Sequence, residues 1–418
     1  MSRRLVATAV AGVALIGSCA GATELASEQD VSIIRAPATI ALRDVRVVPM
    51  TSEQRLDHQT VVVRDGRIES ITPNETATIP TDAIVVEGRG RFLMPALIDM
   101  HVHLRRADLP AYLRYGIATV RNMWGHDGIP SMMRDVETGT IDGPTIHSTS
   151  NGFDGSPPQW PQTRLVLDAA DAERAVAEAV ASGWSVLKVY QRLSAAVYDS
   201  IVQSAKRHGV QFVGHVPGEV SVLHALASGQ RSIEHLSGYD RAVTRRGGTG
   251  TFAWTDVDQA KFAELARATV DAGTWNCPTM AILVQLSQQH SPDERAAIIQ
   301  NRRRFLAELA RQRARLLVGT DAGIDVVSPG VSIHDELREF VAAGLTPFQA
   351  LQAATLHAAE FLGAPQLGTI APGAPAELLL LDGDPLANIE NARRIGGLVI
   401  RGSWFSVAEL EKRASRRP

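Results

Sequence analysis

The stretch FLMPALIDMHVHL, residues 92–104, places an apolar run directly before two histidines that are one residue apart. Because side chains alternate across a β-strand, His101 and His103 face the same way. Four more short apolar runs end in polar residues that can bind metal: WSVLKVY with Lys188, VQFVGHV with His215, QRSIEHL with His235 and RLLVGTDAG with Asp321. Helical periodicity separates most of these runs, which predicts an α/β chain with a parallel barrel and one metal site at its mouth.

Each polar residue, taken alone, also has an explanation without metal. A lone His-x-His pair is common on surfaces, and Asp321 in GTDAG suits a turn or a helix N-cap. Their joint occurrence at successive strand ends favours a metal site, since Zn²⁺ accepts imidazole and carboxylate ligands. Lys188 fits such a site once burial has removed its proton, because the neutral amine can take up CO₂ as a carbamate that bridges two ions.

Longer motifs extend this pattern over residues 40–405. They are MPALIDMHVHL, GIATVRNM, VLKVY, GHVPGEV, SIEHLSGY, GTDAG and the segment from His334 to Ile389. With these motifs the chain resembles the amidohydrolase superfamily, in its imidazolonepropionase-like and prolidase-like branch. The resemblance implies a (β/α)₈ TIM barrel with a small β-sandwich formed from both chain ends.

The resemblance also implies a role for each polar residue. The ligands of two divalent ions, expected to be Zn²⁺, would be His101, His103 and Asp321 for the more buried ion, carboxylated Lys188 between the ions, and His215 and His235 for the second ion. A hydroxide held between the ions would attack the substrate, and Asp321 would pass the proton to the leaving group. This agrees with general chemistry, in which metal lowers the pKa of water and a carboxylate shuttles protons.

The bridging lysine distinguishes subclasses of the superfamily. Deaminases and imidazolonepropionases generally use one metal and lack it, so Lys188 favours hydrolysis of an amide or peptide bond in a dipeptide, an N-acyl amino acid or a related small amide. The loop HSTSNGFDGSPPQW, residues 147–160, lacks the Gly-Gly-His signature of many prolidase-like members, so prolidase specificity does not transfer directly. The alternatives are a lactonase or other esterase, and a mononuclear cyclic amidase or deaminase. A non-catalytic scaffold would be expected to have lost ligands, and the full set is present.

Several other residues are candidates for contact with the substrate. Hydrogen-bonding candidates are Tyr190, Tyr239 and His334; candidates for an apolar wall are Trp124, Phe153 and Trp160; candidates to pair with a substrate carboxylate are Arg121, Arg241, Arg245 and Arg246.

The two chain ends predict additional segments. Residues 1–22 combine Arg3 and Arg4 with an apolar stretch too short to span a membrane, which predicts a secretory signal. LIGSC, ending at Cys19, resembles a bacterial lipobox and predicts a lipid anchor, with ordinary cleavage after Ala20 or Ala22 as the alternative. Either signal predicts export to a periplasm or an outer-membrane face. The expected divisions are a linker at 23–39, the β-sandwich at 40–91 and 366–405, the metal-binding barrel at 92–365, and a C-terminal tail at 406–418, whose basic end from Lys412 to Arg417 is expected to be solvated.

Composition agrees with an enzyme of this kind. The chain has 418 residues, 45% of them hydrophobic, which is ample for a large core. The net charge of −3 shows no strongly basic character, so nucleic acid is not an expected partner and a small-molecule substrate is. Cys277 has no evident disulfide partner and is expected to be a small buried residue. The oligomeric state stays open.

Overall fold

The computed structural model describes residues 38–415. The predicted signal segment, Cys19 and residues 23–37 of the predicted linker therefore lie outside the described residues.

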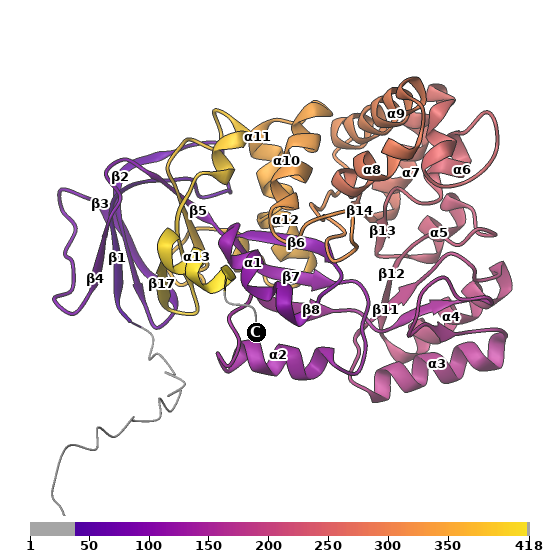
Figure 1. Cartoon of the computed structure of the whole chain (residues 1–418), viewed down its shortest axis with the longest axis horizontal. Coiled ribbons are helices and arrows are strands. Elements are labelled where there is room, and N and C mark those ends of the chain that lie inside the picture. The colour runs from indigo at the N-terminus through magenta and orange to yellow at the C-terminus, as the bar shows by residue number, and fades with distance from the viewer. Residues whose placement is uncertain (1–37, 416–418) are drawn as a thin grey trace, which may run out of the picture. The chain divides into compact units, whose positions relative to one another are not determined.

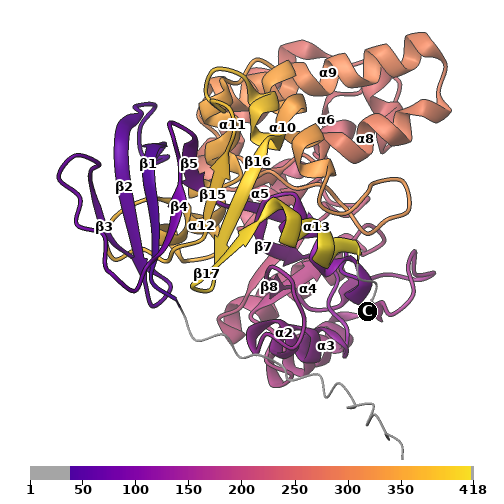
Figure 2. The same ribbon diagram turned by 60° about the vertical axis from the view of Figure 1, so that its left-hand side comes forward.

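Strands from both ends of the chain share the larger sheet (Figure 1). Its order within the described residues is β17 (Ser403–Ser406), β16 (Ile395–Ile400), β15 (Leu378–Leu381), β5 (Phe92–Pro95), β1 (Ile40–Val47), β2 (Leu56–Arg64) and β3 (Arg67–Pro73), with β4 (Ile84–Glu87) paired to β1. The β2–β3 hairpin turns at Asp65 and Gly66, whose φ angles of 51° and 72° suit an Asp-Gly turn. Figure 2 shows the C-terminal strands β15, β16 and β17 in yellow on the other side of β5 from β1 and β2.

Phe92 begins a strand of this sheet, so the predicted barrel boundary at residue 92 is wrong. β5 pairs antiparallel with β15 and parallel with β1. The first barrel strand is β6 (Leu97–Val102), which follows after a single intervening residue, Ala96. The sequence FLMPALI crosses from one sheet to the other without a polar residue. No change of hydrophobic pattern therefore marks the transition.

Eight strand positions close a parallel barrel within the described part of the chain. After β6 they are β7 (Ile117–Asn122), β8 (Thr145–Ser148) continuing into β9 (Gly152–Asp154), β11 (Val186–Val189), β12 (Gln211–Gly214), β13 (Ser232–Glu234), β14 (Trp275–Cys277) and the segment 316–322. This last segment closes the ring, because Leu317 N–H donates to Asn276 of β14 and Met100 N–H of β6 donates to Val318. A short strand, β10 (Arg164–Leu165), extends the ladder beside β9. The predicted (β/α)₈ barrel is confirmed.

Helices follow most barrel strands, and side-chain caps mark several of their ends. The α-helices of this part are α1 (Leu109–Arg114), α2 (Ile129–Glu137), α3 (Ala169–Ala181), α4 (Ala195–His208), α5 (Val222–Ser228), α6 (Tyr239–Val243), α7 (Phe262–Ala272), α8 (Met280–Leu286), α9 (Pro292–Arg311), α10 (Ser332–Ala342), α11 (Pro347–Ala353) and α12 (Leu356–Phe361). Single 3₁₀ turns are η1 (Arg106–Asp108), η2 (Thr251–Thr255), η3 (Gln259–Lys261), η4 (Ser287–Gln289), η5 (Pro365–Gly368) and η6 (Ile389–Arg393). Ser291 and Glu294 form a capping box that begins α9. Gly209, at φ 66°, ends α4 in the left-handed region.

The last described residues form a helix, so the predicted C-terminal tail is helical over residues 407–415, while Lys412 and Ser415 in its basic end are exposed. Helix α13 (Val407–Ser415) contacts α1, β16 and β17. Leu410 is 1% exposed, and Glu411 forms an ion pair of 2.8 Å with Arg114 of α1. Arg413 pairs with Asp142 and lies over the Phe405 ring, so the basic end of the helix also packs against the protein.

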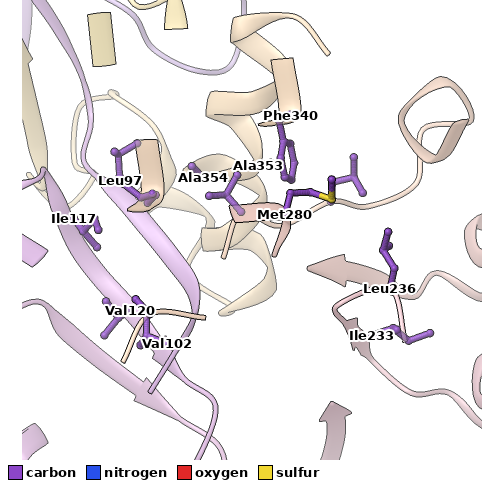
Figure 3. Close-up of a cluster of buried hydrophobic side chains, with 14 of the residues drawn as sticks. Leu97, Val102, Ile117, Val120, Ile233, Leu236, Met280, Phe340, Ala353 and Ala354 are labelled. Atoms are coloured by element: carbon purple, nitrogen blue, oxygen red, sulfur yellow. The ribbon is translucent and has the colours of Figure 1, made fainter. Parts of the chain in front are cut away.

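The barrel strands and their helices share one apolar core. Figure 3 shows Leu97 and Ile117, from β6 and β7, in the same cluster as Phe340, Ala353 and Ala354 from α10 and the end of α11. This packing fixes the strand ends, where the polar residues lie. None of the helices in the described part of the chain combines the length and apolarity that a membrane crossing requires.

Candidate metal centre

The six residues predicted to bind metal line one cavity of about 430 Å³. They come from the C-terminal ends of five of the eight barrel strands: His101 in β6 with His103 just after it, Lys188 in β11, His215 after β12, His235 after β13, and Asp321 in the closing segment. The barrel therefore gathers residues that are up to 220 positions apart in the sequence, numbers 101 and 321, at one rim.

The Asp321 carboxylate lies among three imidazoles. Its Oδ1 is 2.9 Å from Nε2 of His103 and 3.2 Å from Nε2 of His101. Its Oδ2 is 3.9 Å from Nδ1 of His235. One ligand atom each from His101, His235 and Asp321 lies within 4.8 Å of the others, which is close enough to share one ion.

The other half of the cavity wall is formed by Lys188, His215 and His235, with Tyr190 beside them. The rings of His215 and His235 have centroids 4.7 Å apart, and the ring of Tyr190 lies 4.2 Å from that of His215. Lys188 is 1% exposed, and its Nζ lies 6.0 Å from the Tyr190 ring. These residues line the same cavity as the group around Asp321.

The hydrogen bond of His101 to Glu234 indicates its protonation. Nδ1 of His101 lies 2.8 Å from Oε2 of Glu234, a carboxylate that accepts and cannot donate while ionised. The ring proton of a neutral His101 is therefore on Nδ1, and Nε2 presents a lone pair toward Asp321. Burial alone would raise the pKa of Glu234, but Arg121 and His101 hold it well below its usual range, so Glu234 is ionised.

Two buried acceptor atoms are left facing each other, and this arrangement fits a cation. Neither Nε2 of His101 nor Oδ1 of Asp321 has a hydrogen-bond partner within the described residues, although the two atoms are 3.2 Å apart. Unpartnered buried acceptors are rare, because each costs the free energy of its lost hydration. A divalent ion bound to both would supply that missing interaction, and the nitrogen and oxygen donors suit Zn²⁺.

The other imidazoles are also held by their Nδ1 atoms. Nδ1 of His235 lies 2.7 Å from the hydroxyl of Thr279, which itself donates to the carbonyl of Pro278 and therefore accepts from His235. Nδ1 of His215 lies 3.0 Å from the amide nitrogen of Gln191, which donates to it; a 180° rotation of this amide would present its oxygen and leave Nε2 of His215 free for a metal ion. Such outer partners orient metal-binding histidines.

Burial sets the charge state of the cavity. Burial lowers the pKa of His103, His215 and His235, the last to about 3, so these rings are neutral at pH 7. Burial also lowers the pKa of Lys188 to about 8, which leaves part of its amine neutral near physiological pH. For Asp321, burial would raise the pKa, but charge and hydrogen-bond interactions with the surrounding histidines outweigh burial at the low pH where this carboxyl titrates, so its pKa lies well below the usual value.

The backbone at the rim adopts conformations that L-residues rarely use. His235 has a φ of 63° and Asp321 a φ of 62°, both in the left-handed region. Gly323 has a φ of 103°, and a Cβ there would lie 1.8 Å from the carbonyl oxygen of His103. Such strained positions persist where the surrounding structure holds them, and they concentrate at functional sites.

Three buried residues beneath the rim support His101, and sequence reasoning missed this role. Glu234 accepts from the guanidinium of Arg121 at 3.1 and 3.2 Å and from the hydroxyl of Ser232. Arg121 also donates to the carbonyl of Met100 at 2.6 Å, so it is a structural residue and the prediction that it pairs with a substrate carboxylate is wrong. The one sequence signal for Glu234 is its place directly before His235 at a strand end.

Other predicted contact residues lie outside the cavity. Tyr239 is fully buried in α6 with its hydroxyl 2.6 Å from that of Thr269, because the chain turns at Gly238 (φ 82°) after His235. His334 is buried in α10, with Nε2 3.2 Å from the carbonyl of Tyr115. Phe153 is buried in the core of the barrel. The predictions for these three are wrong, whereas Tyr190, Trp124 and Trp160 do line the cavity.

The remaining predicted arginines also have structural partners. Arg241 donates to the carbonyls of Pro217 and Val220, at 2.7 and 2.8 Å. Arg245 and Arg246 pair with Asp258 and Asp256 at 3.2 and 3.3 Å. None of the three is among the described residues that line the cavity.

Comparison with known proteins identifies the class that this fold and site define. The model of the amidohydrolase family matches residues 92–405, so the chain belongs to that family. An adenine deaminase of Rubrobacter xylanophilus is 24% identical over 403 residues, which cover 90% of this chain and 59% of the deaminase. The chain thus spans little more than half the length of the curated relatives it matches.

Solved structures share the same fold at low sequence identity. A prolidase in complex with N-methylphosphonate-L-proline has a TM-score of 0.69 at 22% identity, covering 88% of this chain and 99% of its own. The bottromycin amidohydrolase has a TM-score of 0.71 at 24% identity, covering 93% of this chain and 94% of its own. At these identities the likeness supports the fold.

Proposed function

We propose that this chain is a binuclear metal-dependent hydrolase that cleaves an amide or peptide bond in a small substrate: a dipeptide, an N-acyl amino acid or a related small amide. The observation that carries the proposal is the pair of unpartnered acceptors, Nε2 of His101 and Oδ1 of Asp321. Electron-rich atoms this close repel each other unless a cation lies within reach of both. Membership of the amidohydrolase family supports the same chemistry.

The proposed ligands divide the cavity into two halves. They are His101, His103 and Asp321 for one ion, His215 and His235 for the other, and Lys188 between them. When bound, two divalent ions, proposed to be Zn²⁺, would lower the pKa of water and polarise the substrate carbonyl. Lys188 would contribute as a carbamate, which forms when its neutral amine bonds to the carbon of CO₂ and loses one proton.

Asp321 is the proposed proton carrier. Its pKa lies well below the usual value, so it is ionised, and it lines the cavity proposed to bind the substrate. It would accept a proton from the attacking water and deliver it to the leaving nitrogen, so that the C–N bond breaks to an amine and a carboxylic acid. Positioned proton transfer of this kind contributes about 10²–10⁴-fold to a rate.

Deamination is the second candidate. The curated relatives that cover most of this chain are adenine deaminases, and a deaminase also attacks carbon bonded to nitrogen with activated water. The buried lysine in the cavity favours the binuclear amide hydrolase, because a carbamate there supplies a ligand to a second ion. Lactone and ester hydrolysis would use the same residues.

The test is a comparison of metal-free and zinc-loaded protein. The probes are dipeptides, N-acyl amino acids, lactones and adenine, assayed for each expected product. The proposal predicts amide hydrolysis that chelation abolishes and zinc restores. Adenine deamination without amide hydrolysis would favour the second candidate, and a loaded protein inert toward every probe would contradict both.

A further inference from the structure

The outer cavity wall is a connected series of aromatic rings. The indole N–H of Trp160 donates to the hydroxyl of Tyr190 at 2.7 Å, and the Tyr190 ring meets that of Trp124 edge-on, with centroids 5.2 Å apart. The Trp124 ring in turn lies 6.5 Å from that of His103. We call Trp124, Tyr190 and Trp160 the aromatic wall; it runs from the candidate metal ligands to the partly exposed mouth, where Trp160 is 41% exposed.

The backbone beneath the wall is shaped to receive it. A Cβ on Gly152 would lie 2.2 Å from the Trp124 ring, so the absence of a side chain lets that indole lie against the start of β9. A Cβ on Gly155 would lie 1.9 Å from the carbonyl oxygen of Arg192, which closes the loop that carries Trp160. The side-chain amide of Asn151 also donates to Gln162 in this loop, at 3.2 Å. The rings are therefore held in place before a ligand binds.

Two polar residues beside the wall, Arg105 and Asn122, already have partners. Arg105 is the one arginine among the described residues that line the cavity, and it pairs with Asp108 at 2.7 Å and Asp325 at 3.4 Å. One cation between two carboxylates gives this part of the rim a net negative charge. Asn122 donates to the carbonyl of Trp124 and accepts from the N–H of Leu104. Among the described residues on this side of the cavity, the one arginine already faces two carboxylates, which disfavours a substrate carboxylate there.

We infer that, among the proposed substrates, the site favours a small amide without a free carboxylate over a dipeptide or an N-acyl amino acid, and that an aromatic group of this amide packs against the aromatic wall. Edge and face contacts between aromatic rings are favourable in this geometry, and three fixed rings offer them without ordering cost. The hydroxyl hydrogen of Tyr190 is left to donate to the substrate, because its oxygen accepts from Trp160. This inference rests on the proposed hydrolase function for its catalytic part and on the wall alone for its binding part.

Three probes separate the aromatic contribution from that of charge. N-benzoylglycinamide is neutral and aromatic, N-acetylglycinamide is neutral without a ring, and N-benzoylglycine has the ring and a carboxylate. For zinc-loaded protein we expect kcat/KM for the benzoyl amide to exceed that for the acetyl amide by about tenfold or more, as apolar pockets discriminate groups of this size. The benzoyl acid should be a poorer substrate than its amide.

Variants assign the preference to the wall. Trp160→Ala should reduce the benzoyl-to-acetyl ratio by about tenfold, and Tyr190→Phe, which keeps the ring and removes the bond to Trp160, should reduce it less. Phe252→Ala is the matched control, since Phe252 is a similarly exposed aromatic residue (43%) outside the cavity. An equal effect of Phe252→Ala, a ratio near one in the parent protein, or preference for the benzoyl acid would overturn the inference.

Calorimetric titration of the metal-free protein with N-benzoylglycinamide gives a readout independent of turnover. If no probe is hydrolysed, the hydrolase proposal fails and this titration alone decides. Binding that Trp160→Ala weakens about tenfold would then uphold the aromatic wall as a binding surface. Absence of binding, or binding unaffected by Trp160→Ala, would reject it.

Discussion

Replacement of Glu234 by Gln tests whether the buried network positions the metal site. Glu234 is fully buried, accepts from His101 at 2.8 Å and is the buried counter-charge of Arg121. The amide keeps the shape but loses the charge and one acceptor oxygen. Removal of one partner from a buried ion pair typically costs about 3–5 kcal/mol of unfolding free energy. Loss of the outer partner of a metal-binding histidine typically costs about 10–100-fold in metal affinity.

The two effects are measured separately. Urea unfolding of the metal-free protein gives the free energy of unfolding, and competition with a chromogenic chelator gives the zinc affinity. Glu178→Gln is the control, because Glu178 pairs with Arg164 at the surface (3.0 Å, 60% exposed) and its loss should change stability by no more than about 0.5 kcal/mol. If Glu234→Gln matched the parent in both assays, the network would have no part in positioning His101.

Three further outcomes are expected. Lys188→Ala should lower zinc content from two equivalents per chain to one, measured by mass spectrometry of metals, and unchanged content would reject the bridging role. Asp321→Asn should lower turnover by about 10²–10⁴-fold with the far-ultraviolet circular dichroism retained, and near-normal turnover would refute proton transfer by Asp321. Burial raises the pKa of Glu336 from 4.5 to about 8, so the folded chain retains a proton that the unfolded chain releases, and stability should fall as pH rises between these values. The Glu336→Gln side chain stays neutral, so the urea midpoint of this variant, relative to that of the parent, should rise as pH increases across that window. A difference in midpoint that does not change with pH would contradict the raised pKa of Glu336.

The candidate site could be predicted because its residues follow strand ends. In a parallel barrel every strand delivers its C-terminal end to the same rim, so positions such as His215 and His235 meet whatever the intervening chain does. Residues beyond the strand ends do not obey this rule. Tyr239 follows Gly238, whose positive φ turns the chain into α6. The residue types near Gly238 do not predict the direction of this turn.

The buried ion pair of Arg121 with Glu234 also could not be predicted from the sequence. An arginine can pair with a substrate carboxylate or with a carboxylate of the protein itself. Because Glu234 is 113 positions away from Arg121, the sequence does not distinguish the two cases. The boundary between the two sheets was missed for a different reason: β5 and β6 are both buried on two faces and read as one apolar run. Within the described part of α13, Leu410 is the one buried residue, and the charged residues around it made a packed helix hard to predict from the sequence.

The central claim is that five segments of the barrel rim bring the six donor residues around a pair of ions. Its most direct test is an anomalous difference map, recorded at the zinc edge, of crystals of zinc-loaded protein. The account predicts two peaks, one within coordination distance of His101, His103 and Asp321 and one within that of His215 and His235, with extra density on Nζ of Lys188 between them. A single peak with Lys188 outside its coordination shell, or no peak in the cavity, would contradict the account.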